Sequence, residues 1–175
     1  GSGLVGSEMC IRDSLKTVMK HDDAVMRLLT LYNATAKYDK AIKIMDTRHF
    51  HLWEGGGQVH DIYVDSHMLK GMQLLKRKQY KEAIREFDLA NQYPANLEVA
   101  PSPRGGYEAK VYYLSGIAYE AMKQADKARE CFEKSAETHF RDYLTDLNYY
   151  KIKSLRKLNK NEKADAVLSN MQKTL

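Results

Sequence analysis

Histidines and carboxylates gather in one stretch of this 175-residue sequence, and both are side chains that bind metal ions. His49 and His51 alternate, so on an extended segment their side chains would point the same way. Four further candidates follow within the next residues: His60, Asp61, Asp65 and His67. No HExxH or equivalent spacing fixes these residues as a ligand set. We therefore predict structural or hydrogen-bonded histidines, with no bound metal and no other cofactor.

A second chemical candidate is Glu54, which follows the only tryptophan, Trp53, and precedes the glycine run 55–57. A carboxylate beside an aromatic ring could act as an acid in sugar chemistry. A glycosidase, however, needs a second carboxylate at a set separation, and Asp61 and Asp65 qualify only by their closeness in the sequence. We therefore predict that the protein is not an enzyme. Recognition remains open for the loop, with these candidates: Arg48, His49, His51, Trp53 and Glu54. The alternative is a loop that only seats Trp53 against the helix ends.

Composition and charge are those of a globular chain, with 43% hydrophobic and 29% charged residues. The whole net charge of +5 is accounted for by residues 151–175, which hold seven basic and two acidic side chains. We interpret this surplus as the solvated face of a terminal helix pair. Tyr149 and Tyr150 add aromatic rings to it, but the surplus is modest and confined to one end, so we predict no nucleic-acid partner.

Membrane and secretion signals are not visible. No apolar run approaches the roughly 20 residues of a membrane-spanning helix, so we predict no membrane partner. Neither a basic n-region nor an apolar h-region opens the sequence, and the compartment, cytoplasmic or periplasmic, stays open. The two cysteines, Cys10 and Cys131, form no CxxC motif.

The chemistry-bearing residues must be positioned by helices, because residues 65–94 have the pattern of a helix–turn–helix unit. Small residues at Gly71 and Ala83 allow two helices to approach closely, and Phe87 fills the space beside them. Alanines recur along the chain at Ala41, Ala83, Ala128 and Ala164. We expect Ala83 and Ala128 to be buried where helices meet.

This pattern resembles the tetratricopeptide repeat, whose period is about 34 residues. The resemblance implies an all-α fold, a right-handed superhelix of about four helical hairpins. The expected repeats are residues 22–48, 65–94, 107–137 and 143–175, with two inserted loops between the first three. The first 14 residues resemble a cloning scar and a translated sequencing adapter, so we expect them to be disordered and the repeat domain to span 15–175.

A narrower resemblance rests on RHFHLWEGGG at residues 48–57 and on YPANL at residues 93–97. Both are similar to the C-terminal repeat region of large bacterial proteins that carry an N-terminal domain of unknown function, related to carbohydrate-active β-sandwich folds. This resemblance implies an alternative role, as the accessory region of a carbohydrate-processing protein. In that role the Trp53 loop contacts a glycan or the N-terminal domain.

The main functional prediction is a protein–protein interaction scaffold that binds a peptide or a partner domain, such as its own N-terminal domain, in a concave groove. In the family, the first helix of each pair lines this groove. By register the lining residues are Met68, Met72, Lys76, Tyr113, Ile117, Glu120, Tyr149, Lys153, Arg156 and Lys157. Met and Tyr offer apolar contact, and Lys or Arg can hold a carboxylate. For Met68 and Met72, four residues apart, the alternative is a place in the core.

Overall fold

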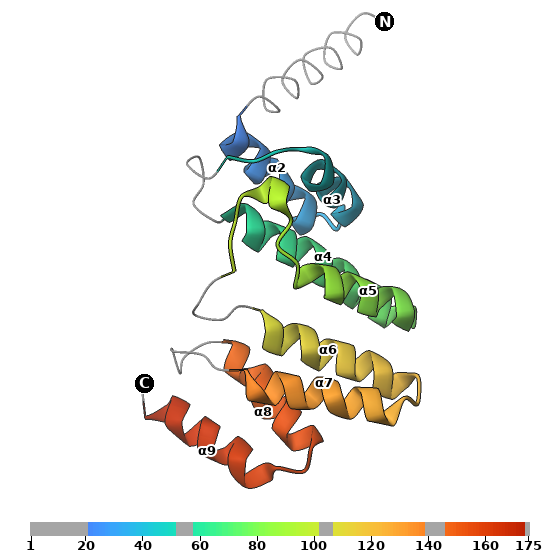
Figure 1. Ribbon diagram of the computed structural model, residues 1–175, viewed down its shortest axis with the longest axis vertical. Coiled ribbons are helices and arrows are strands. Elements are labelled where there is room, and N and C mark those ends of the chain that lie inside the picture. The colour runs from blue at the N-terminus through green and yellow to red at the C-terminus, as the bar shows by residue number, and fades with distance from the viewer. Residues whose placement is uncertain (1–20, 52–57, 102–106, 139–145, 174–175) are drawn as a thin grey trace, which may run out of the picture. The chain divides into compact units, whose positions relative to one another are not determined.

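The computed structural model describes residues 21–51, 58–101, 107–138 and 146–173 (Figure 1). In these ranges the chain forms α-helices and one short 3₁₀ helix, and no β-strand. The helices are α2 (Asp22–Ala34), α3 (Tyr38–Thr47), α4 (Gln58–Lys76), α5 (Tyr80–Ala90), η2 (Ala95–Leu97), α6 (Glu108–Ala121), α7 (Ala125–Glu137), α8 (Asp146–Lys157) and α9 (Asn161–Gln172). The all-α prediction is confirmed.

The helices form four hairpins, α2–α3, α4–α5, α6–α7 and α8–α9, whose turns share one backbone conformation. In each turn one residue has a left-handed φ of 55° to 62°: Ala36, Lys78, Lys123 and Asn159. The next backbone N–H donates to a carbonyl five residues earlier, at 2.8–3.0 Å, which is the closing bond of a Schellman motif. Each left-handed residue lies five positions before one of the regularly spaced alanines. The four alanines therefore occupy equivalent positions in the four hairpins.

Close packing within the hairpins depends on the small residues. Ala83 and Ala128 are buried, as predicted. A Cβ atom built on Gly71 would lie 2.4 Å from Cε1 of Phe87, and one built on Gly116 would lie 2.5 Å from the equivalent carbon of Phe132. Each aromatic ring thus rests directly on a glycine of the preceding helix. The contact recurs in two hairpins because the spacing recurs in the sequence.

One helix start differs from the expected one. Helix α4 begins at Gln58 rather than at Asp65, because the residues after the glycine run carry a helical apolar pattern with Val59 and Tyr63 buried. Helix α2 begins at Asp22, the first residue of the expected first repeat. None of the helices in the described ranges is long and apolar enough to cross a bilayer.

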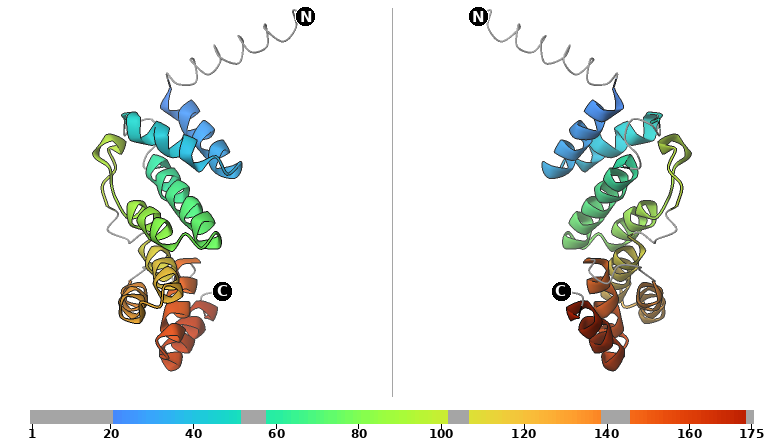
Figure 2. Two further views of the ribbon diagram at one scale, coloured as in Figure 1. Left: turned by 90° about the vertical axis from the view of Figure 1, so that its right-hand side faces the viewer. Right: turned by 90° about the vertical axis from the view of Figure 1, so that its left-hand side faces the viewer.

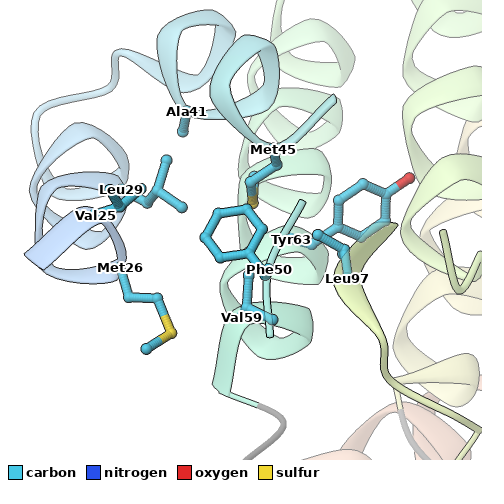
Figure 3. Packing of buried hydrophobic residues seen from close by; sticks show 9 residues of the cluster. All are labelled: Val25, Met26, Leu29, Ala41, Met45, Phe50, Val59, Tyr63 and Leu97. Carbon is cyan, nitrogen blue, oxygen red and sulfur yellow. The ribbon is translucent and has the colours of Figure 1, made fainter. Parts of the chain in front are cut away.

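The chain divides into two compact units, one containing residues up to Ser66 together with Pro94–Val99, and the other containing His67–Tyr93 together with the residues from Ala100 onward. The first unit is built around an apolar cluster from α2, α3, the start of α4 and the segment Pro94–Val99 after α5, which we call the strap (Figure 3). Its buried members are Val25, Met26, Leu29, Ala41, Met45, Phe50, Val59, Tyr63 and Leu97. Leu97 shows that the segment after Pro94 is part of the first unit's core.

In the second unit, α6 contacts α5, α7 and α8, and α8 also contacts α9 (Figure 2). Because it has neighbours on several sides, α6 buries residues around most of its circumference. A buried polar relay joins three of these helices: the Ser154 hydroxyl donates to Ser135 Oγ at 2.7 Å, and the Ser135 hydroxyl donates to the Ala109 carbonyl at 2.8 Å. The right-handed superhelix and the single domain spanning 15–175 stay predictions.

Candidate functional site

The best-defined surface of the second unit lies where α6 and α8 meet. On α6, Tyr113, Ile117 and Glu120 are spaced four and three residues apart, so they share one helix face. On α8, Tyr149, Lys153 and Lys157 are each four residues apart, so they also share one helix face. The two helices are in contact, and side chains of these two helix faces touch each other. We call these six residues the α6–α8 surface.

Lys153 is at the centre of the α6–α8 surface. Its Nζ lies 5.1 Å from the ring centroid of Tyr113 and 4.9 Å from that of Tyr149. It also donates to the Tyr149 hydroxyl at 3.2 Å. The hydrogen bond with Tyr149 raises the pKa of Lys153, with burial opposing the rise. The ammonium is therefore charged at neutral pH, and within the described ranges it contacts tyrosines rather than a carboxylate.

Lys157 extends this surface toward a pocket. Its Nζ lies 2.6 Å from Oε2 of Glu120, and both side chains are partly exposed. Both residues help line a pocket of about 400 Å³ formed with the α7 face and the α8–α9 turn. The remaining lining residues are Ala125, Ala128, Arg129, Phe132, Glu133, Leu158, Asn159 and Lys160. The pocket mixes charged walls with one aromatic side chain.

Four other residues of the predicted groove set do not take part in this surface. Met68 is buried, which makes it a core residue and corrects its assignment as a contact residue. Met72 is half-buried and Lys76 is exposed, both on α4. Arg156 is exposed and pairs with Asp165 of α9 at 3.6 Å. Tyr113 is also mostly buried, so its ring packs against Lys153 and is little exposed to a binding partner.

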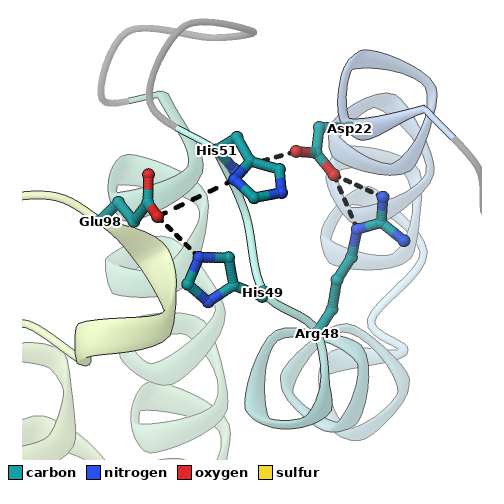
Figure 4. Close-up of polar contacts among 5 residues, drawn as sticks. All are labelled: Asp22, Arg48, His49, His51 and Glu98. Carbon is teal, nitrogen blue, oxygen red and sulfur yellow. Dashed lines mark hydrogen bonds and ion pairs between the residues drawn. The ribbon is translucent and has the colours of Figure 1, made fainter.

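In the first unit, the segment Arg48–His51 is held by Asp22 (Figure 4). The Arg48 guanidinium donates to Oδ1 of Asp22 through Nε at 2.8 Å, and the His51 backbone N–H donates to Oδ2 at 3.1 Å. Burial opposes ionisation of the Asp22 carboxyl, but the hydrogen bonds from His51 and Arg48 and the Arg48 charge outweigh it, so the pKa of Asp22 is lowered. Arg48, a predicted recognition residue, is therefore a structural partner of Asp22.

The two histidines of that segment face a carboxylate from a distant part of the sequence. Nε2 of His49 lies 2.6 Å from Oε1 of Glu98, and Nδ1 of His51 lies 3.8 Å from the same oxygen (Figure 4). The histidine ring centroids are 5.0 Å apart. All three side chains remain partly exposed, Glu98 the least. The alternation of His49 and His51 therefore places both on one side, as expected.

The other histidine candidates are structural. His60 is buried and stacks on Tyr63, with ring centroids 6.1 Å apart. His67 is buried with its Nδ1 2.7 Å from Oε2 of Glu86, and Lys70 pairs with the other oxygen at 2.7 Å. Both side chains are therefore buried parts of the fold. Trp53 and Glu54 lie outside the described residues.

Sequence reasoning missed Glu98, and it gave no structural role to Asn96 of the YPANL motif. The Asn96 side-chain amide donates to the Met45 and Arg48 carbonyls, both at 2.7 Å, and the Phe50 N–H donates to the Asn96 carbonyl at 2.8 Å. The two motifs RHFHLWEGGG and YPANL are thus in direct contact. Their joint occurrence was the signal that could have placed Glu98 beside the histidines.

Repeated helical hairpins with one shared turn geometry define the class: a helical-repeat scaffold. Residues 109–138 match the family model described as Tetratricopeptide repeat, and the helical structure fits a protein of that kind. The repeat supports a scaffold for protein–protein interaction, and folds of this kind are typically non-catalytic.

Two solved structures are also similar. "MamA RS-1 ArsTM double mutant" shares 17% identity with a TM-score of 0.43, and "MamA 41-end from Desulfovibrio magneticus RS-1" shares 18% with a TM-score of 0.42. Each match covers 95% of this chain and 89% of the other.

Proposed function

We propose that the protein is a binding scaffold whose α6–α8 surface takes an acidic peptide segment of a partner protein. The observation that carries this proposal is Lys153, a charged ammonium set between two tyrosine rings without a carboxylate contact in the described ranges. An acidic side chain or chain terminus would complete that arrangement, since a lysine binds a carboxylate as a point charge.

Tyr149 supplies the apolar part of the same contact. It is 53% exposed, one of the most exposed large hydrophobic residues in the described ranges. Its ring meets Tyr150 edge-on at a centroid distance of 5.3 Å, and it is bonded to Lys153 through its hydroxyl. A tyrosine fixed in this way loses little side-chain freedom on binding, which favours it as an interface anchor.

The test uses fluorescein-labelled 12-residue peptides that alternate Glu or Asp with Leu or Phe, matched with peptides in which Gln and Asn replace the acids. Fluorescence polarisation should show tighter binding of the acidic set, weakening as salt rises. Lys153→Glu and Tyr149→Ala should each weaken binding at least about tenfold. Lys81→Glu, an equal charge change at an exposed site on α5, is the control and should leave binding unchanged.

Equal binding of acidic and amide peptides, or equal effects of Lys153→Glu and Lys81→Glu, would refute the proposal. The alternative role, contact of the Trp53 loop with a glycan, stays a prediction from the sequence resemblance.

A further inference from the structure

We propose that His49, His51 and Glu98 bind one divalent transition-metal ion of the zinc class. The three residues offer two imidazole nitrogens and a carboxylate oxygen, and these ligand atoms all lie within 4.8 Å of one another. This site is separate from the α6–α8 surface and involves residues of the first unit only. No part of the proposed peptide binding depends on it.

The three ligand atoms would need to move only a little to surround a zinc ion. Ligands at the usual zinc distances in a tetrahedral site are about 3.4 Å apart. The observed separations from Glu98 Oε1, 2.6 Å to His49 Nε2 and 3.8 Å to His51 Nδ1, lie on either side of that value. Since the His49 and His51 side chains are 53% and 58% exposed, both rings have room to rotate into place.

The backbone that carries the ligands is held on both sides. Between the two histidines, Phe50 is buried in the apolar cluster and its N–H is bonded to Asn96. His51 is bonded through its N–H to Asp22. On the opposite segment, Leu97 is buried directly before Glu98. Binding therefore orders few additional groups, which is the condition for a tight site.

Glu98 has an unusual backbone for its residue type. It caps η2 with φ 51° and ψ 29°, the left-handed region. Among the described residues, the other non-glycine residues with positive φ all lie in the four hairpin turns. Non-glycine residues with such strained backbone angles are often found at functional sites. Here the conformation accompanies a carboxylate that faces two histidines.

The ligand chemistry favours zinc over magnesium or calcium. Imidazole nitrogen suits zinc, cobalt, nickel and copper, whereas magnesium and calcium prefer sets made only of oxygen. Two histidines and one carboxylate leave a position open to water, the arrangement of an open zinc site. The competing account is a simple hydrogen-bonded histidine–carboxylate cluster that binds no ion.

The experiment is isothermal titration of the full chain with zinc chloride in a non-chelating buffer, with cobalt(II) absorption as a second readout. We expect one zinc per chain and cobalt bands of a four- or five-coordinate ion. His49→Ala and Glu98→Gln should each weaken zinc affinity by more than about 100-fold, because loss of a direct ligand exceeds the loss of an outer partner. His21→Ala and Glu82→Gln, at exposed sites elsewhere, are the matched controls and should not change it.

Nitrogen-15 NMR of the histidine rings gives a readout that does not depend on substitution. Zinc should shift Nε2 of His49 and Nδ1 of His51, the atoms nearest to Glu98. Absence of 1:1 zinc binding overturns the proposal, as does unchanged affinity in both His49→Ala and Glu98→Gln. Shifts confined to His21, His60 or His67 would place the ion elsewhere and would overturn it equally.

Discussion

Replacing Gly71 with alanine tests the packing on which the repeat fold rests. On an exposed helix the change stabilises by about 1 kcal/mol, because glycine is a poor helix former. At Gly71 the new methyl carbon would lie 2.4 Å from Cε1, 2.7 Å from Cδ1 and 3.1 Å from Cζ of Phe87. Carbon atoms pack at about 3.5–4.0 Å, so the overlap exceeds about 1 Å.

The cost follows from the lack of room around the ring. Phe87 is fully buried, so its ring cannot move toward solvent, and the two helices must separate instead. Overpacking of this kind costs about 1–3 kcal/mol, and the close contact places Gly71→Ala near the upper end. After the helix-propensity gain, we expect a net loss of about 2 kcal/mol. In a chain of this size that lowers the Tm by about 4–8 °C.

Urea unfolding and thermal unfolding, both followed by far-UV circular dichroism, measure the change in free energy and in Tm. The double variant Gly71→Ala, Phe87→Leu should be more stable than the sum of the single effects predicts, by at least about 1 kcal/mol, because the smaller side chain removes the clash. Gly116→Ala repeats the test against Phe132, where the corresponding distances begin at 2.5 Å. An unchanged or raised Tm in both alanine variants would show that the helices are not packed as described.

Two further predictions concern the first unit's ion pair and a hairpin turn. Because the pKa of Asp22 lies below its ordinary value, its contribution to stability is present above about pH 4 and is lost as the pH falls. Asp22→Asn should therefore cost about 2 kcal/mol at pH 7 and flatten the loss of stability between pH 5 and 3 in urea titrations, whereas parallel curves would contradict this. Lys123→Gly should stabilise by about 0.5–1 kcal/mol, because glycine adopts the φ of 60° without a steric cost. Asn159→Gly, where asparagine already tolerates that conformation, should gain less, and equal Tm shifts for the two would argue against strain as the cause.

The hairpin register could be predicted because it depends on contacts between residues close in the chain. Gly71 and Phe87 lie on adjacent helices joined by one turn, so their sizes alone indicate how the helices meet. The same pair of residue types recurs at Gly116 and Phe132, so the sequence indicates this helix contact twice. The second repeat was expected to begin at residue 65, whereas α4 begins at Gln58, because the helical apolar pattern starts directly after the glycine run.

Met68 illustrates a limit of register arguments. Its position on the first helix of a pair is shared with residues that line a surface, and a methionine suits either setting. Only the burial of the side chain in the packed unit assigns it to the core. Lys153 is the opposite case, because its long side chain reaches two tyrosines on different helices, one of which is 40 residues away.

By itself, the sequence determined the helical class, the recurring small residues where paired helices meet and the alternation that sets His49 and His51 on one side. Those features follow from residue size and backbone preference within short stretches. The tertiary structure alone decided that Glu98 faces these histidines, since the strap from Pro94 to Val99 returns to the first unit through Leu97 and Asn96. That return depends on burial and hydrogen bonds between segments about 50 residues apart in the sequence, which no local periodicity records.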